Sequence, residues 1–166
     1  MERKTFLKKG LLGAGMLVGG HTVFTQDKAS DNFSLEEIRE FVFAAHKDFE
    51  KVKKIITEKP LILNCANQSR KGDFETAMGG ASHMGRKDIA DLLVERGARL
   101  DIFNHTFLGH IDLVKTMIKD YPQYLTSYGP HGFTLLHHAK AGKHEYFAKW
   151  LIDQGLTESH FKDVFK

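Results

Sequence analysis

Two stretches of the chain, residues 76–97 and 134–155, share one pattern of residue types at matched spacing. Each begins with a threonine, has an alanine five residues later and ends with a glycine twenty-one residues after the threonine. A further glycine and a pair of apolar residues lie between these positions. The residues are Thr76, Ala81, Gly85, Leu93-Val94 and Gly97 in the first stretch, and Thr134, Ala139, Gly142, Leu151-Ile152 and Gly155 in the second. Self-similarity at a fixed spacing predicts a fold built from similar units packed against one another.

The apolar spacing predicts helices in pairs with short connections. Ser34 and Glu37 form a capping box, which marks a helix N-terminus, and apolar residues then recur at helical spacing over 35–45. A second helix begins near Phe49 and is ended by Pro60. Further helices are expected over Thr76–Met84, Lys87–Arg96, Ile102–Leu108, Ile111–Lys119 and His144–Gln154, and a final amphipathic segment over Thr157–Lys166. Asp101 is the expected N-cap of the helix over Ile102–Leu108, and residues 61–75 are expected to form a loop.

Several strings of residues carry a family resemblance. The string TLLHHA (134–139) resembles the T-P-L-H-x-A signature of the ankyrin repeat, with Leu135 in place of proline. Strings at 41–53, 71–90, 97–103 and 129–142 are together similar to a group of bacterial ankyrin-repeat proteins. Lys143 departs from the pattern, because it stands where the unit usually has glycine. The resemblance implies an all-α fold, an ankyrin-repeat solenoid of about four helix-turn-helix units with short β-turn fingers and a C-terminal capping helix.

The first residues have the composition of an export signal. A basic head is followed by an apolar run from Gly10 to Gly20 and a more polar tail. The head resembles the bacterial twin-arginine motif, with Lys4 in place of the second arginine. We therefore expect an export signal over 1–25, a linker over 26–33 and the repeat domain over 34–166, in a periplasmic protein. The apolar run is too short to cross a bilayer comfortably, so no stable membrane span is expected in the mature form. A cytoplasmic tail and a retained membrane tether are the alternatives.

The charge distribution gives no reason to expect nucleic-acid binding. Of the 24 basic and 21 acidic residues, four basic and one acidic lie in residues 1–25, which leaves 20 of each in the rest. A balanced domain has no general field that would attract a polyanion. The sequence contains no nucleophile elbow, phosphate-binding loop or dinucleotide fingerprint, so we predict neither enzymatic activity nor a cofactor.

The ten histidines give no recognisable metal motif. His137 and His138 are adjacent on a predicted helix and point about 100° apart, so they cannot chelate one ion from one face. Neither H-E-x-x-H nor a paired Cys/His spacing occurs, and the single cysteine, Cys65, excludes an internal disulfide. We therefore predict no metal site. Scattered histidines such as His83, His105 and His131 are the alternative ligands.

The resemblance implies that the protein binds another protein through its turn tips and concave face. The residues that this assigns to partner binding are Lys71, Asp73, Glu75, His83, Met84, Tyr128, His131 and Phe133. Phe133 and Tyr128 are candidate aromatic anchors, although Phe133 can equally pack against the next turn. The predicted function is thus a non-catalytic, monomeric scaffold with a periplasmic protein partner. The alternative is a periplasmic protein that binds a small molecule or responds to a metal through its histidines.

Overall fold

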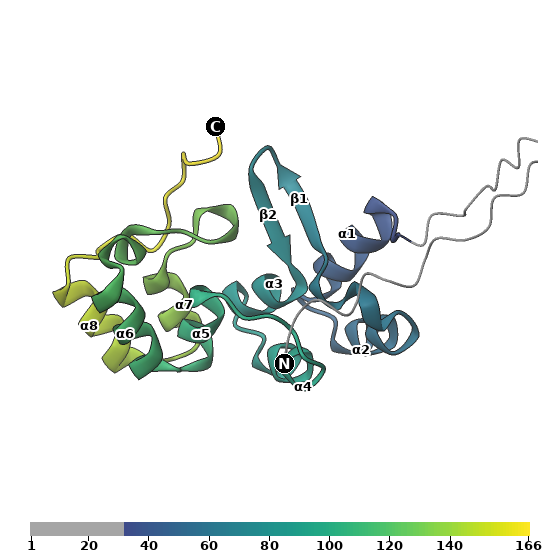
Figure 1. Ribbon diagram of the computed structural model, residues 1–166, viewed down its shortest axis with the longest axis horizontal. Helices are drawn as coiled ribbons and strands as arrows, with labels where there is room; N and C mark the ends of the chain where they lie inside the picture. Colours follow the sequence, from purple (N-terminus) through teal and green to yellow (C-terminus); the bar gives the residue numbers. More distant parts are fainter. Residues whose placement is uncertain (1–31) are drawn as a thin grey trace, which may run out of the picture. The chain divides into compact units, whose positions relative to one another are not determined.

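Residues 32–166, the part of the chain that the computed structural model describes, contain eight α-helices in four consecutive pairs (Figure 1). The helices are α1 (Leu35–Ala44), α2 (Phe49–Glu58), α3 (Ala77–His83), α4 (Lys87–Glu95), α5 (Ile102–Leu108), α6 (Ile111–Asp120), α7 (Leu135–Ala141) and α8 (Glu145–Asp153). The helix positions predicted from apolar spacing are confirmed to within two or three residues at each end. The predicted export signal over 1–25 lies outside the described residues, as does most of the linker over 26–33.

Local capping explains where several helices begin. The predicted capping box is present at α1, where the Ser34 hydroxyl accepts from the Glu37 N–H and the Glu37 carboxylate accepts from the Ser34 N–H. Asp101 caps α5 in the same reciprocal way with Asn104. Thr76 caps α3 by accepting from the Gly79 N–H at 3.1 Å. Each such cap satisfies backbone donors that a helix N-terminus otherwise leaves unpaired.

The predicted all-α solenoid is wrong, because residues 66–76 form a two-stranded antiparallel sheet. Strand β1 (Ala66–Arg70) pairs with β2 (Asp73–Thr76) across a tight turn in which Gly72 has a φ of +80°. The described residues are therefore a mixed α/β structure. The expectation of a loop over 61–75 failed for a physical reason. Strand β2 buries Asp73 and Glu75 and exposes Phe74, the reverse of the usual pattern, so apolar periodicity did not reveal it.

The predicted C-terminal capping helix is also absent from the described residues. After α8, residues 157–166 form an isolated bridge and turns instead of a helix. Three short 3₁₀ segments lie between the helices of residues 32–166: η1 (Pro60–Asn64), η2 (Pro122–Thr126) and η3 (Pro130–Gly132). Proline begins each of them, as expected where a fixed φ suits the first position of a helical turn.

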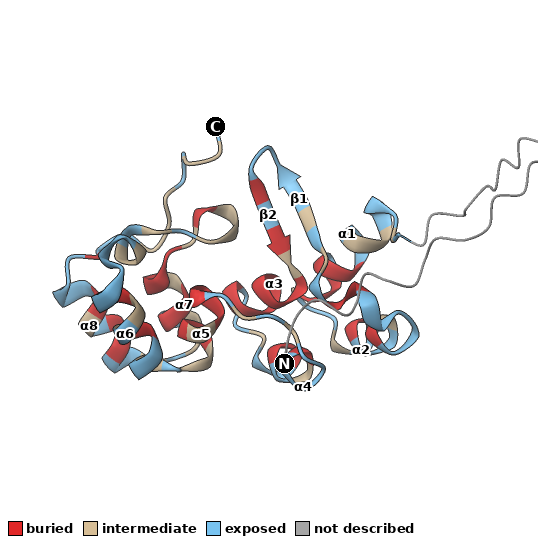
Figure 2. Ribbon diagram, viewed as in Figure 1, coloured by how far each residue is buried: buried red, intermediate tan, exposed pale blue. Residues whose placement is uncertain are grey.

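Two apolar cores hold residues 32–166 together. One lies among α1 to α4 and includes Phe41, Met78 and Leu93, and the other lies among α5 to α8 and includes Leu135 and Phe147. Helix α3 contacts α1, α5 and α7, and Figure 2 shows that α3 is buried along its length and that β2 carries buried residues beside it. Helix α3 therefore lies where elements of both cores meet. No helix in the described part of the chain has the length and apolar character that crossing a membrane requires.

Candidate metal centre

Glu75 is the centre of a cluster of three histidines. Its side chain is only 2% exposed, and it enters the interior because β2 turns it inward beside α3. One carboxylate oxygen, Oε1, lies 2.7 Å from His83 Nε2. The other, Oε2, lies 3.4 Å from both His46 Nε2 and His131 Nε2. Four side chains from distant parts of the sequence therefore converge on one point, with one ligand atom of each within 4.8 Å of all the others.

Each histidine is supplied by a different element. His46 lies just beyond the end of α1, His83 is the last residue of α3, and His131 lies in η3. The His46 and His83 Nε2 atoms are 3.2 Å apart. The His46 and His131 side chains are each about one-fifth exposed, whereas His83 is buried, so the cluster opens to solvent on the side of His46 and His131.

His131 is held in an unusual backbone conformation by a buried aspartate. Its φ is +60° and its ψ is +5°, the left-handed region that residues with a Cβ seldom adopt. The Asp73 carboxylate, which is fully buried, accepts from the His131 backbone N–H at 2.9 Å and from the His131 Nδ1–H at 2.9 Å. A strained residue fixed by a buried charge is the kind of feature that occurs at functional sites.

The outer ring nitrogens determine what the inner ones can do. The Nδ1 atom of His46 lies 2.9 Å from the Val42 carbonyl oxygen, and that of His131 lies 2.9 Å from an Asp73 carboxylate oxygen. Both partners can only accept, so each Nδ1 carries a hydrogen. In a neutral ring the Nε2 atom then carries no hydrogen and faces the Glu75 carboxylate, which is itself an acceptor. The arrangement is favourable only with a positive charge, supplied either by a proton on an imidazole or by a bound cation.

Electrostatics keep negative charge at the centre. Burial acts to raise the pKa of Glu75, but hydrogen bonds with His46 and His83 outweigh burial and lower the pKa to about 2. The hydrogen bond with Glu75 raises the pKa of His46 above its ordinary value. At neutral pH the buried carboxylate is therefore ionised, and it is balanced either by a proton on an imidazole or by another cation.

The spacing of the ligand atoms suits a tetrahedral metal ion. Zinc binds histidine nitrogen and carboxylate oxygen at about 2.0–2.2 Å, which places neighbouring ligand atoms of a tetrahedron about 3.3–3.5 Å apart. The separations of 3.2, 3.4 and 3.4 Å are close to that value. His83 Nε2 lies closer than this, at 2.7 Å, to the other carboxylate oxygen, Oε1, and one ligand atom of each of the four residues lies within 4.8 Å of the others. The outer hydrogen bonds of His46 and His131 are those that orient histidine ligands in metal proteins.

The residues predicted to contact a protein partner fall into two groups. Lys71, Met84 and Tyr128 are exposed, with Met84 at 53% and Tyr128 at 43%. Asp73, Glu75 and His83 are buried, and His131 and Phe133 are partly buried against them. Partner binding stays a prediction, and only the first group is fully available for it. The second group contributes instead to the cluster around Glu75.

Sequence reasoning found part of this cluster and missed the rest. It named His83 and His131 as scattered ligands, but it grouped them with His105, which instead lies 2.8 Å from His110. His46 and Glu75 were not considered as ligands, and no metal site was predicted. The segment Asp73-Phe74-Glu75 has two carboxylates at alternate positions, the spacing of one strand face, but its sequence does not show that this face is buried.

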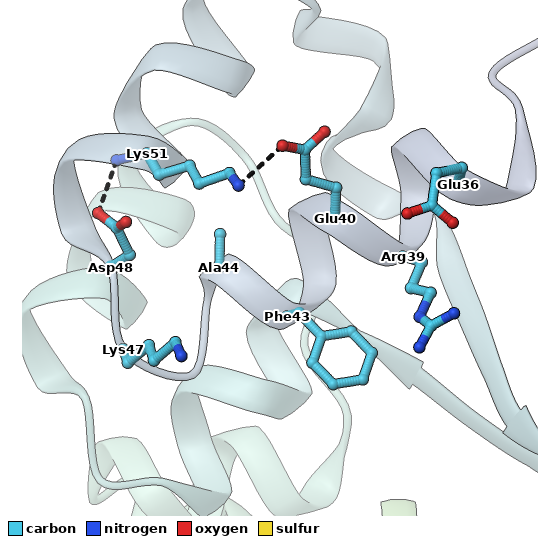
Figure 3. A pocket seen from close by; sticks show the side chains of 8 residues that line it. All are labelled: Glu36, Arg39, Glu40, Phe43, Ala44, Lys47, Asp48 and Lys51. Atoms are coloured by element: carbon cyan, nitrogen blue, oxygen red, sulfur yellow. Dashed lines mark hydrogen bonds and ion pairs between the residues drawn. The ribbon is translucent and has the colours of Figure 1, made fainter.

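Other features of the described residues offer less chemistry. A hollow with a volume of about 520 Å³ lies beside α1 and the start of α2 and is lined by three acidic and three basic side chains. Figure 3 shows the side chains that line it. Lys51 donates to Glu40 at 2.7 Å across it. The lining charges balance and leave no preference for a ligand of either sign. The contact between His105 and His110 provides two nitrogens, fewer than a stable metal site needs.

Comparison with known proteins adds no assignment. No protein-family model matches the chain, and no curated protein matches it. In the described residues, the fold is a mixed α/β structure built from pairs of helices. A cluster of three histidines and one carboxylate lies where its two cores meet.

Proposed function

We propose that this protein binds a divalent transition metal ion, with zinc the first choice, through His46, Glu75, His83 and His131. The observation that carries the proposal is the convergence of three imidazole Nε2 atoms on one buried carboxylate. A divalent ion suits this arrangement, because neutral imidazoles donate lone pairs to it and it balances the charge of the carboxylate. Three nitrogens and one oxygen, with no sulfur, favour zinc and its neighbours in the first transition row over calcium or magnesium.

The arrangement supports binding more than catalysis. All four positions of a tetrahedral ion are filled by protein side chains, which is typical of sites that stabilise or sense, whereas catalytic zinc keeps a position for water or substrate. The site also connects elements of both cores, since His46 and His83 come from the first four helices and His131 from the segment before α7. Metal binding is therefore expected to stabilise the whole folded domain.

A zinc titration of metal-free protein tests the proposal. We expect one zinc per chain by equilibrium dialysis and a visible cobalt spectrum of the tetrahedral type. Free zinc at one hundred times the dissociation constant should add about 2.7 kcal/mol to the free energy of unfolding, which raises the melting temperature by several degrees.

Two variants separate a specific site from general histidine binding. His131→Asn keeps a side-chain donor for Asp73 and tolerates a positive φ, but it lacks the Nε2 ligand, so zinc stabilisation should disappear. His105→Asn removes a histidine outside the cluster and should leave the zinc stabilisation unchanged. Equal zinc stabilisation of both variants, or no zinc uptake by the unmodified protein, would refute the proposal.

A further inference from the structure

The segment after α8 lies along the turn that carries His131. The Phe161 N–H donates to the Gly132 carbonyl at 2.9 Å, and the Thr134 N–H donates to the Ser159 carbonyl at 3.1 Å. The His160 ring nitrogen Nε2 lies 2.9 Å from the carbonyl oxygen of His131 itself. Because the carbonyl can only accept, this ring nitrogen carries the hydrogen. Residues 158–161 are thus bonded to the turn through its backbone.

Residues 158–161 lie so close to the His131 turn that their position depends on the backbone conformation of the turn. Gly132 has a φ of +88°, and a Cβ built there would lie 2.4 Å from the Phe161 carbonyl oxygen. Only glycine at this conformation allows the two backbones to meet. A change in the φ of His131 or Gly132 therefore removes the surface on which residues 158–161 lie.

Phe133 provides a second connection between the cluster and the C-terminal segment. Its ring stacks on His83 with centroids 5.1 Å apart, and its other neighbours include His160 at 4.8 Å. The backbone of Phe133 also forms a bridge with His160. Two of the four proposed ligands, His83 and His131, thus contact the C-terminal segment either directly or through one aromatic ring.

We propose that metal occupancy at the Glu75 cluster controls whether residues 157–166 are docked on the His131 turn. This inference rests on the proposed metal binding. His131 occupies a left-handed conformation that is unfavourable for a residue with a Cβ. Coordination of its Nε2 holds the residue there, whereas loss of the ion leaves only the hydrogen bonds with Asp73 and His160 to do so. The metal-free turn relaxes more readily and releases the segment. The coupling is reciprocal, so undocking the segment must weaken metal binding by the same factor.

Hydrogen exchange on the full chain measures the docking directly. We expect the Phe161 and Thr134 amides to exchange at least tenfold more slowly in zinc than in chelator, relative to any change at the Ala148 amide within α8. In His131→Asn the two amides should exchange at the same rate in both conditions. Dialysis on the same samples reports zinc binding separately.

A variant of the segment tests the reverse direction. His160→Ala removes the contact with the His131 carbonyl and lies outside the ligand set, so it should bind zinc three- to tenfold more weakly and lose zinc-dependent protection at Phe161. Lys162→Ala, which changes an exposed side chain of the same segment, should behave as the unmodified protein. Zinc uptake without added protection at Phe161 would overturn the docking inference and leave metal binding intact. Absence of zinc uptake would overturn both.

Discussion

Gly80 shows how closely a single residue is fitted to His46, one of the proposed metal ligands. A Cβ at Gly80 would lie 2.9 Å from Cε1 and 3.0 Å from Nδ1 of the His46 ring. These distances are shorter than real Cβ contacts, so the ring would have to move. A Cβ at the neighbouring Gly79 would have Pro130 Cγ as its nearest neighbour, at 3.5 Å, which is an ordinary contact distance. The two helical glycines therefore form a matched pair.

We predict that Gly80→Ala weakens zinc binding by at least tenfold, because it displaces the His46 ligand. Gly79→Ala should bind zinc as the unmodified protein does and should gain up to about 1 kcal/mol of stability from improved helix propensity. Competition titrations against a chelator measure both affinities. Equal zinc affinities for the two variants would mean that the position of the His46 ring does not matter for binding.

His138 is a second residue with a sharp environment, outside the cluster. It is fully buried in α7, its Nδ1 donates to the Thr134 carbonyl at 2.8 Å, and its Nε2 is the buried side-chain atom without a partner among the described residues. Burial lowers the pKa of His138 to about 3. The ring is therefore neutral in the folded protein throughout the physiological range.

This residue should make the fold sensitive to mild acid. Between about pH 6.5 and the folded pKa the unfolded state binds a proton that the folded state does not, so stability falls as pH decreases. The loss amounts to about 1.4 kcal/mol per pH unit for one such group. His138→Asn keeps a donor for the Thr134 carbonyl. We predict that the free energy of unfolding of this variant falls less steeply with decreasing pH, by about 1.4 kcal/mol per pH unit. Urea unfolding in chelator at pH 7 and pH 5 measures it, and parallel slopes for the two proteins would contradict the assignment.

At the scale of single elements, the turn between α7 and α8 uses an unfavourable residue. Lys143 has a φ of +60°, whereas Gly142 before it is helical, with a φ of −78°. The first copy of the sequence pattern has Gly85 at a φ of +69° in the corresponding turn, between α3 and α4. Lys143 departs from the repeat pattern in the sequence, and the structure shows that the backbone at this position is left-handed although the residue is not glycine.

We predict that Lys143→Gly raises the free energy of unfolding by about 0.5–1 kcal/mol, since glycine adopts a positive φ without steric cost. Lys140→Gly in the preceding helix should have the opposite effect, because glycine is a poor helix residue. Urea unfolding midpoints of the two variants give the comparison. A loss of stability in Lys143→Gly would show that contacts of the lysine side chain matter more than its backbone strain.

The helices could be predicted because their signals are local. Caps at Ser34 and Asp101 and apolar residues at helical spacing fix their positions within a few residues. The sheet could not be predicted in this way, since the alternation in β2 places carboxylates inside and Phe74 outside. The same inversion concealed the site, because it is the inward carboxylates that gather the histidines.

For the whole molecule, tertiary contacts decide what the local patterns leave open. The hydrogen bonds between Asp73 and His131 join residues 58 positions apart, and no spacing rule connects them. The spacing of Phe161, Val164 and Phe165 predicts a helix in the C-terminal segment, but its backbone forms hydrogen bonds with the His131 turn instead.

Export of the chain stays a prediction, and mass spectrometry of the mature N-terminus would test it.

The sequence positions of the ligands affect when and where the protein can be loaded. A growing chain presents His46, Glu75 and His83 well before residue 131 is synthesised, so the complete set of proposed ligands exists only after that point. A four-ligand site therefore requires η3 to have packed against the elements that supply the other three ligands. If the predicted export occurs, the compartment in which the chain folds determines which pool of ions it encounters, and a protein transported in the folded state would carry cytoplasmic metal across the membrane.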